Sequence, residues 1–575
     1  MLRRIFSYMK EYKKYAWLAL ICIGVEVVLE IMVPKLMADL IDIGVTNSDV
    51  PYIINKGIQM AVCAVAALIL GVGSARFSAL AGQGLGANIR KAEYDKLQSY
   101  SFSNIDHFSV SSLVTRLTSD VTNIQNAVST GMRPFGRSPV MMIFATTLAF
   151  QINSTLALVF LVALPVLAVL LIIIIINVGP RYGRMQGAVD LVNRCIEENL
   201  TAVRVVKSYV RGDYEIEKFG HVNDNLKNES EKAFGIAVLN MPAMQFVMYS
   251  TILGILLIGG RLINSGQMMI GQLTSFLSYV LLILNSLMMM SNVFLLMTRS
   301  LASAERIMKV IDEPIDITDE NAKDIEVKKG EIEFNHVWFK YKDTAKEYVL
   351  SDVSFHINAG QTVGIIGQTG SSKTTLIQLI PRLYDATKGE IKIDGINVKE
   401  YPVRHLRDAI SVVLQKNTLF SGSLIDNLRW GDENATLDEI KEACSIACVD
   451  EFIDRLPGGF DAEMGQEGVN VSGGQKQRIC IARAILKKPK VLILDDSTSA
   501  VDTATEGKIK NALAKKLPDM TKIIIAQRIS SVCQADQIII MDGGRVDAIG
   551  THESLLRTNK IYQEIYESQK EGADF

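Results

Sequence analysis

The sequence contains Gly367-Gln368-Thr369-Gly370-Ser371-Ser372-Lys373-Thr374, directly after the apolar run Thr362–Ile366 and before a segment with helical periodicity. These residues nearly match the P-loop pattern G-x-x-x-x-G-K-[ST], in which backbone N–H groups at a helix N-terminus wrap nucleotide phosphates. Lys373 would reach the outer phosphates, and the Thr374 hydroxyl would bind Mg²⁺. Because Ser372 stands where the pattern has a glycine, an ordinary Gly/Ser-rich turn is the alternative interpretation.

Two downstream segments favour nucleotide binding. Val491-Leu492-Ile493-Leu494-Asp495 is a strand pattern that ends in an acid, the Walker B arrangement, in which Asp495 would hold Mg²⁺ through water. Val471-Ser472-Gly473-Gly474-Gln475 lies before it, and Ser472 there would cap a helix whose N-terminus favours an anion. The glycine segment alone would be an ordinary turn. Beside a P-loop and a Walker B strand, it predicts a second phosphate-binding element.

The surroundings of these motifs indicate an α/β domain. From Gly330 onward, strand patterns such as Glu331–Phe334 alternate with helix patterns, which is typical of a mainly parallel sheet. The acidic stretch Asp312–Lys329, which contains Pro314, is the expected linker to what precedes it.

The upstream part of the chain is poor in charge. Residues 57–75, 138–180, 233–260 and 262–298 contain no Asp, Glu, Lys or Arg. One membrane helix needs about 20 mainly apolar residues. We therefore expect six transmembrane helices, at about 15–37, 57–86, 133–151, 155–178, 240–260 and 271–297. The alternative, six apolar helices inside a soluble protein, is disfavoured by the run Ile172–Ile176 within a long apolar span.

Flanking charge predicts the orientation in the membrane. Five basic residues precede the first helix, whereas the loop after it is acidic, so the positive-inside rule places the N-terminus in the cytoplasm. Six spans then return the chain to the same side, and the C-terminal domain is cytoplasmic. The polar segments 87–132 and 179–239 would be cytoplasmic helical arms. The expected location is the plasma membrane, with multiple passes.

The overall composition excludes several classes of protein. The 60 Lys and Arg residues balance 62 Asp and Glu residues, and 49% of residues are hydrophobic, which argues against a disordered or nucleic-acid-coating chain. Seven cysteines among 575 residues are too few for a disulfide scaffold. Cys444 and Cys448 form a C-x₃-C pair without a nearby histidine, which favours helix packing over zinc binding.

With these motifs together, the chain resembles the ABC transporter family, specifically exporters that fuse both domains in one half-transporter. The resemblance covers nearly all of the chain. It implies an all-α six-helix membrane domain over residues 1–311 and a linker over 312–329. Residues 330–575 would form a cytoplasmic α/β P-loop NTPase domain with a RecA-like core and a helical subdomain. ATP and Mg²⁺ are the implied cofactors, and ATP hydrolysis would drive export of an amphipathic or hydrophobic substrate.

The resemblance assigns further positions. Tyr341 resembles the aromatic residue that stacks on adenine, and Gln415 resembles the Q-loop glutamine that contacts Mg²⁺. Ser499–Asp502 resembles the D-loop, Gly465–Gly468 a coupling segment, and Phe108–Asp120 and Arg204–Phe219 the regions with coupling helices. The implied nucleotide-binding residues are Tyr341, Gly367, Gln368, Thr369, Gly370, Ser371, Ser372, Lys373, Thr374, Thr375, Ser472, Gly473, Gly474, Gln475 and Asp502, and the implied Mg²⁺ ligands are Thr374, Gln415 and Asp495.

Two catalytic positions depart from the family pattern. Asp496 stands where the family has a glutamate as general base, and Gln527 stands where it has a switch histidine. Aspartate is one methylene shorter, and loss of a positioned base costs about 10²–10⁴-fold in rate. Glutamine can still donate a hydrogen bond to a phosphate, but it cannot carry the charge of an imidazolium. With Gln415, these residues predict a site that binds nucleotide and hydrolyses it slowly, although harmless drift is an alternative.

In the dimer of this family, these departures affect the ATP sites that contain this chain's P-loop. Each ATP lies between the P-loop of one subunit and the signature segment of the other, so Ser472–Gln475 would complete a partner's site. We expect a heterodimer with a partner that supplies glutamate and histidine. The alternatives are a slow homodimeric exporter and an ATP-gated channel or regulatory ATPase subunit. An importer is less expected, because importers of this family usually keep the two domains on separate chains.

Charged residues in the predicted spans are ambiguous. Glu26 and Glu30 are one helical turn apart and share a face of the first span. Such acids usually face the bundle interior or a water-filled cavity. They would either attract a cationic substrate or serve a structural role, and Arg76 has the same ambiguity. Eight methionines in and between the last two spans lean weakly towards an amphipathic drug or lipid as substrate: Met241, Met244, Met248, Met268, Met269, Met288, Met289 and Met290.

Overall fold

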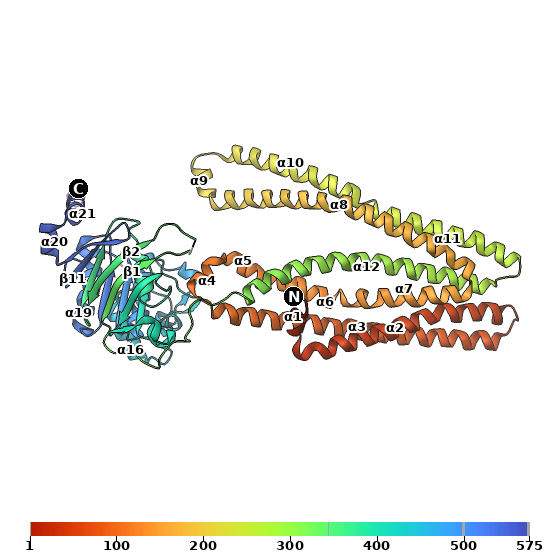
Figure 1. The fold of residues 1–575 in the computed structure, drawn as a ribbon, viewed down its shortest axis with the longest axis horizontal. Helices are drawn as coiled ribbons and strands as arrows, with labels where there is room; N and C mark the ends of the chain where they lie inside the picture. The colour runs from red at the N-terminus through yellow and green to blue at the C-terminus, as the bar shows by residue number, and fades with distance from the viewer. Residues whose placement is uncertain (1, 343, 497–500, 572–575) are drawn as a thin grey trace. The chain divides into compact units, whose positions relative to one another are not determined.

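The computed structural model describes residues 2–342, 344–496 and 501–571 (Figure 1). The chain forms two compact units. The helical unit contains residues 1–98 and 111–312, and the α/β unit contains residues 99–110 and 313–575. Segment 99–110, which sequence reasoning placed in a cytoplasmic arm, thus groups with the α/β unit.

The helical unit consists of long helices joined by short turns. The described elements are α1 (Leu2–Ser7), η1 (Lys10–Tyr12), α2 (Lys13–Asp39), η2 (Leu40–Val45), α3 (Val50–Gln98), η3 (Arg116–Asp120), α6 (Val121–Ser129), α7 (Met132–Ile152), α8 (Ser154–Thr201), α9 (Val203–Ser208), α10 (Gly212–Ala237), α11 (Asn240–Asn264) and α12 (Ile270–Ile311), with α5 (Val110–Thr115) at the boundary. Among the described residues, four helical stretches are long and apolar enough to cross a membrane: Lys10–Val45, Val50–Gln98, Gly212–Asn264 and Ile270–Met290. The other two predicted spans fall on α7 and on the first half of α8.

Two apolar clusters hold these helices together. One joins α2, α7, α8, α11 and α12 and includes Phe276 and Tyr279. The Tyr279 hydroxyl donates a hydrogen bond to Ile31 O (3.1 Å), which fixes α12 against α2. The second cluster joins α1, α3, α6 and α12 around Leu85 and Ile307. The cytoplasmic-arm prediction for 179–239 corresponds to the far half of α8 with α9 and α10, and α8 and α10 run side by side (Figure 1).

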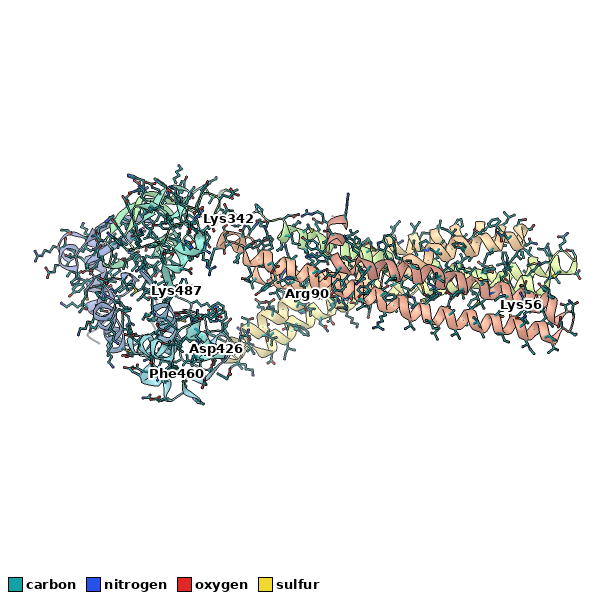
Figure 2. The ribbon with its side chains drawn as sticks, turned by 90° about the horizontal axis from the view of Figure 1, so that it is seen from below. Lys56, Arg90, Lys342, Asp426, Phe460 and Lys487 are labelled. Carbon is teal, nitrogen blue, oxygen red and sulfur yellow. The ribbon has the colours of Figure 1, made fainter. Side chains whose placement is uncertain are left out.

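Polar contacts join the helices of this unit, both at helix ends and along α3. Figure 2 shows Lys56 near the turn between α2 and α3, where its ammonium group lies 2.9 Å from Asp39. Arg90 lies farther along α3 and donates a hydrogen bond to Gln125 of α6 (3.1 Å). Asp42 accepts from the backbone N–H of Gly271 (2.6 Å) and thereby caps the start of α12.

Three sheets lie in the described part of the α/β unit, and the smallest is the two-stranded antiparallel pair β7-β8. A six-stranded sheet has the order β12-β11-β3-β10-β9-β6, and all neighbours in it are parallel except the edge strand β12. A four-stranded antiparallel sheet has the order β2-β1-β4-β5. This arrangement confirms the predicted α/β fold with a mainly parallel sheet. The strands are β1 (Ile332–Phe339), β2 (Leu350–Ile357), β3 (Thr362–Ile366), β4 (Lys388–Ile393), β5 (Ile396–Asn397), β6 (Ile410–Val413), β7 (Gly422–Ser423), β8 (Glu463–Met464), β9 (Val491–Asp495), β10 (Thr521–Ile525), β11 (Gln537–Asp542) and β12 (Arg545–Gly550).

Helices cover the parallel sheet and position the site. The central strands β3, β9 and β10 are buried on both faces, as expected for a parallel sheet covered by helices. The helices of this unit are α4 (Phe102–His107), α13 (Lys373–Leu379), η4 (Val398–Glu400), α14 (Val403–Asp408), α15 (Leu424–Arg429), α16 (Leu437–Ile446), α17 (Asp450–Ile453), η5 (Gly459–Asp461), η6 (Gln466–Gly468), α18 (Gly473–Leu486), α19 (Thr503–Lys516), η7 (Ile529–Ser531), α20 (His552–Thr558) and α21 (Lys560–Glu571). Strands β3, β9 and β10 are parallel neighbours, so the loops after them meet at one edge of the sheet.

Candidate nucleotide-binding site

The predicted P-loop connects β3 to α13. Gly367 requires a glycine, because a Cβ there would lie 2.2 Å from Met541 O. Ser372 precedes α13 and has φ +69°, in the left-handed region that costs an L-residue about 1–2 kcal/mol. The glycine of the usual pattern would adopt this conformation without that strain. The serine at position 372 therefore adds a local conformational free-energy cost, and the loop still connects β3 to α13 as a P-loop does.

Lys373 is folded back into the loop. Its ammonium group donates hydrogen bonds to the carbonyl oxygens of Gly367 (2.8 Å) and Gln368 (2.8 Å). Burial lowers the pKa of Lys373, while the nearby Asp495 and Asp496 carboxylates oppose this shift. A phosphate group would offer this half-buried ammonium a stronger, charge-assisted acceptor than a carbonyl.

Asp495 ends β9 inside the domain with only 1% of its surface exposed. The Thr374 hydroxyl lies 3.3 Å from its Oδ1, and burial raises the pKa of Asp495. Its Oδ2 atom is buried and has no hydrogen-bond partner among the described residues. A buried carboxylate oxygen without a partner is costly, and a divalent cation would offset that cost. Oxygen atoms of Thr374, Asp495 and Gln415 are of the kind that Mg²⁺ prefers, so these residues fit the cation.

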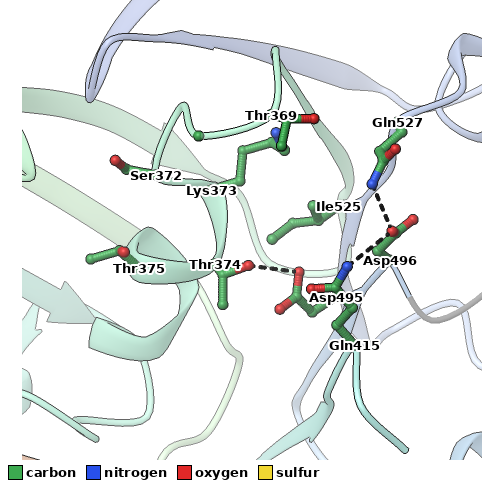
Figure 3. A pocket seen from close by; sticks show the side chains of 11 residues that line it. Thr369, Ser372, Lys373, Thr374, Thr375, Gln415, Asp495, Asp496, Ile525 and Gln527 are labelled. Atoms are coloured by element: carbon green, nitrogen blue, oxygen red, sulfur yellow. Dashed lines mark hydrogen bonds between the residues drawn. The ribbon is translucent and has the colours of Figure 1, made fainter. Parts of the chain in front are cut away.

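The two unusual residues are in direct contact (Figure 3). The Gln527 side-chain amide donates a hydrogen bond to Asp496 Oδ2 (2.9 Å), and the Gln415 amide nitrogen lies 3.5 Å from the same oxygen. Burial raises the pKa of Asp496, while the hydrogen bond from Gln527 and the charge of Lys373 lower it. The backbone of Asp496 has φ +46°, a strained conformation of the kind that is found at functional sites.

These residues surround one cavity of about 330 Å³. Its lining consists of Thr369, Gly370, Ser372, Lys373, Thr374, Thr375, Gln415, Asp495, Asp496, Ile525 and Gln527 (Figure 3). The structure therefore brings together most of the predicted P-loop with the predicted Mg²⁺ ligands and both unusual residues. Ile525, the last residue of β10, is the lining residue that sequence reasoning missed. Its signal was its place at the end of a parallel strand beside Gln527.

The remaining predicted residues lie outside this lining. Tyr341 is next to it: its hydroxyl lies 2.9 Å from Thr375 Oγ1, and 43% of its surface is exposed, which leaves it accessible to a base. Ser472 caps α18 as predicted, because Gln475 N donates to its hydroxyl (3.3 Å) and Ser472 N donates to Gln475 Oε1 (2.8 Å). Gly473 and Gly474 form the first turn of α18. Asp502 caps α19 by accepting from Thr505 N (2.9 Å).

Ser499 and Ala500 of the predicted D-loop lie outside the described residues. Gly465–Gly468 forms the short turn η6, in which Glu467 has φ +54°.

Comparisons with known proteins identify the family. Residues 16–287 match the model of the ABC transporter transmembrane region, and residues 350–499 match the model described as ABC transporter. The uncharacterized ABC transporter ATP-binding protein YfiB of Bacillus subtilis is 37% identical over 575 residues, which cover 100% of both chains. An ATP-dependent lipid A-core flippase of Pseudomonas putida is 32% identical over 98% of this chain and 95% of its own length.

The chain belongs to the ABC transporter family. A solved structure of a bacterial Atm1-family ABC exporter with ATP bound has the same fold, with a TM-score of 0.83 and 22% identity over 97% of this chain and 99% of that chain. This ABC transporter is therefore a membrane-embedded exporter with a cytoplasmic, ATP-binding α/β domain, as the sequence predicted. Its membership also identifies it as an ATP-hydrolysing transport protein.

In this ABC exporter, the short helix α4 packs on the nucleotide-binding domain. The Tyr384 hydroxyl donates a hydrogen bond to Asp106 (2.6 Å), and the Phe102 and Tyr384 rings lie 6.1 Å apart. Tyr384 also contacts Tyr341 edge to face at 5.2 Å. Sequence reasoning placed α4 within the cytoplasmic arm 87–132 and did not predict its contact with Tyr384. The signal of α4 itself was the capping box of Ser101 and Asn104.

The exporter's membrane part contains a second cavity, of about 710 Å³. Glu26, Glu30 and Arg133 line it together with apolar residues of α2, α3 and α12. Glu26 is ion-paired with Arg133 (2.6 Å) and Arg137 (3.3 Å), and Glu30 with Arg137 (2.7 Å). Two guanidinium groups thus offset the two carboxylates, which favours the structural interpretation of Glu26 and Glu30 over the attraction of a cation. Arg76 is exposed and has no ion pair among the described residues.

Proposed function

We propose that this chain is one half of a heterodimeric ABC exporter of amphipathic or hydrophobic molecules. Its own nucleotide site binds ATP and hydrolyses it slowly. Its signature segment, Ser472–Gln475, completes the faster site on a partner subunit. ATP binding brings the nucleotide-binding domains together, and hydrolysis at the partner's site resets them.

The observation that carries the proposal is the contact between Asp496 and Gln527. The carboxylate accepts a hydrogen bond from an uncharged amide (2.9 Å) where the family places a longer acid and a histidine. The amide keeps Asp496 hydrogen-bonded but contributes no positive charge. Loss of a positioned base alone corresponds to a barrier increase of roughly 3–5 kcal/mol. The residues that bind nucleotide are present, so we expect the site to bind ATP but to hydrolyse it slowly.

Each residue of the cavity has a role in this proposal. The P-loop amides and Lys373 bind phosphate groups, and Tyr341 supports the base. Thr374, Asp495 and Gln415 hold Mg²⁺, which neutralises phosphate charge when bound. Asp496 and Gln527 orient water only weakly. Asp495 Oδ2, which has no partner in the part of the chain that the structure describes, and the inward-turned Lys373 support this division, because both gain a partner when nucleotide and cation bind.

The membrane cavity supports the substrate class. Its volume of about 710 Å³ and its mainly apolar lining, which also includes Arg133 and Glu26, suit a molecule with a polar head and an apolar body. Two lipid A-core flippases, from Pseudomonas putida and Desulfotalea psychrophila, and the putative multidrug export protein YgaD of Bacillus subtilis are each 32% identical to this chain. Their names agree with an amphipathic substrate.

The test compares the purified full-length chain alone with its complex with the half-transporter encoded beside it. We expect the chain alone to retain ATP and to turn it over slowly, and the complex to hydrolyse ATP rapidly. We also expect the complex to accumulate an amphipathic dye in inverted vesicles. Rapid hydrolysis by the chain alone would exclude the weakened site. Rapid hydrolysis by the complex without dye accumulation would instead support a gating or regulatory subunit.

A further inference from the structure

The last described helix, α21, packs beside the segment that carries Gln527. Tyr562 of α21 is fully buried, and its hydroxyl lies 2.7 Å from His552 Nδ1. Ile565 and Tyr566 pack against the apolar core that contains Ile529. Gln569 is one turn beyond Ile565, so all of these side chains lie on one face of the helix. That face brings the side-chain amide of Gln569 to the main chain after β10.

Gln569 binds this main chain at two points. Its amide nitrogen donates to Gln527 O (2.7 Å), and its Oε1 accepts from Ile529 N (2.9 Å). One planar amide therefore satisfies a carbonyl and an N–H on either side of Arg528. A two-point contact fixes the direction of the main chain, whereas a single hydrogen bond would let it rotate.

The fixed main chain determines where the Gln527 side chain can reach. Gln527 donates to Asp496 Oδ2 (2.9 Å), and both residues line the nucleotide cavity. A continuous set of hydrogen bonds thus runs from α21 through Gln569 and Gln527 to Asp496. Gln569 is 42 residues away from Gln527 in sequence, yet it holds the main chain of that residue beside the nucleotide cavity.

We propose that Gln569 is a positioning residue for ATP hydrolysis: it holds the main chain of Gln527 and Ile529 so that the Gln527 amide faces Asp496 in the nucleotide cavity. Docking of α21 is thereby linked to turnover. The proposal requires that this site bind ATP, and it does not depend on the partner's identity or on how slow the site is.

The first test is structural. In the full-length exporter with its partner, Gln569→Ala should speed hydrogen exchange of the Ile529 amide about five- to tenfold, because that N–H loses its acceptor. Gln563→Ala is the matched control. Gln563 lies on the same helix and donates to Leu556 O (2.7 Å) in α20, away from Gln527–Ile529. It should leave the exchange at Ile529 unchanged. Unchanged exchange in Gln569→Ala would overturn the proposal.

The second test separates positioning from a structural role. Single-turnover hydrolysis of ATP is measured in exporters whose partner carries a substitution in its own P-loop lysine. Gln569→Ala should lower the rate constant about tenfold with ATP affinity unchanged. In a Gln527→Ala background it should have no further effect, because the side chain it positions is gone.

The outcomes of the second test are distinct. Equal rate losses in both backgrounds, or the same loss with Gln563→Ala, would show that Gln569 only anchors α21 and would overturn the proposal. Each comparison is a ratio of two rates at this chain's site. Fast hydrolysis at this site would therefore refute the proposed slow site, and the ratio would still test Gln569.

Discussion

Ser372 adopts a left-handed backbone conformation (φ +69°) in the loop that is expected to hold phosphate. Glycine tolerates this conformation without steric cost, although it loses more entropy on folding. We expect Ser372→Gly to stabilise the nucleotide-binding domain by about 1 kcal/mol, the difference between these two effects. A rise in the thermal midpoint of the purified full-length chain would measure it.

Thr369 provides the control for this prediction. It lies in the same loop but has no positive φ, so Thr369→Gly adds unfolded-state entropy without relieving strain. The midpoint should fall in this variant. A rise in both variants, or a fall in both, would contradict the assignment of strain to Ser372.

Substitutions at Asp496 and Gln527 should restore the weakened hydrolysis of ATP. Asp496→Glu returns the missing methylene, and Gln527→His returns a group that can carry charge. We expect the double variant of the chain alone to hydrolyse ATP at least about 10²-fold faster than the unmodified chain, the usual worth of a positioned base. Each single substitution should give less than the double, because the two side chains are in contact. A double variant no faster than the unmodified chain would place the defect elsewhere in the site.

The sequence predicted those site residues that belong to short motifs of consecutive residues. The P-loop, the Walker B strand and the signature are each a strand or cap followed by a turn, so a few consecutive residues identify them. Gln569 and Asp106 could not be predicted, because their contacts join residues 42 and 278 positions apart in sequence. Only tertiary packing brings such pairs together, and a lone glutamine or aspartate on a polar helix has no signal of its own.

At the level of elements, ion pairs join α2 to α7. Glu26 is 5% exposed and faces Arg133 and Arg137, which lie 107 and 111 residues away in sequence. The sequence placed Glu26 and Glu30 on one helix face but could not supply their partners, because Arg133 and Arg137 belong to a different helix. The sequence alone therefore leaves both interpretations of the two acids open, and α7 beside α2 supplies the missing partners.

These ion pairs predict a measurable stability effect. Arg137 contacts both acids, so Arg137→Met leaves a buried carboxylate without its full complement of charge. Removal of one partner of a fully buried pair costs about 3–5 kcal/mol. The loss here should be smaller, because Glu26 keeps Arg133 and because Glu30 and Arg137 are only partly buried. We expect a clear fall in the thermal midpoint of the exporter in detergent, and a partial recovery when Glu30→Met is added. Arg76→Met is the control, because Arg76 is exposed and should leave the midpoint unchanged.

At the level of the whole chain, the average composition conceals two different parts. The 49% of hydrophobic residues combines a charge-poor helical unit with an α/β unit of ordinary polarity. The charge-free runs predicted the helical part, and the motifs predicted the fold of the second part, because both signals are continuous in sequence. The helical arms were predicted only in outline, since α4 joins the α/β unit through contacts that no periodic pattern encodes.

The proposed heterodimer makes this chain contribute to two sites in unequal ways, and single substitutions can separate them. Lys373→Ala should abolish ATP retention by this chain's own site and leave most hydrolysis by the complex intact, because the faster site uses the partner's P-loop. Ser472→Ala should do the reverse: it removes a group from the partner's site and should lower hydrolysis by the complex roughly 10²-fold, while this chain still retains ATP.

Thr436→Ala is the control for Ser472, because Thr436 caps α16 through the same kind of reciprocal hydrogen bonds and is not part of the signature. It should leave hydrolysis unchanged. In a homodimer each chain would contribute both groups to equivalent sites, so both substitutions would lower retention and hydrolysis together, and that result would exclude the division of labour proposed here.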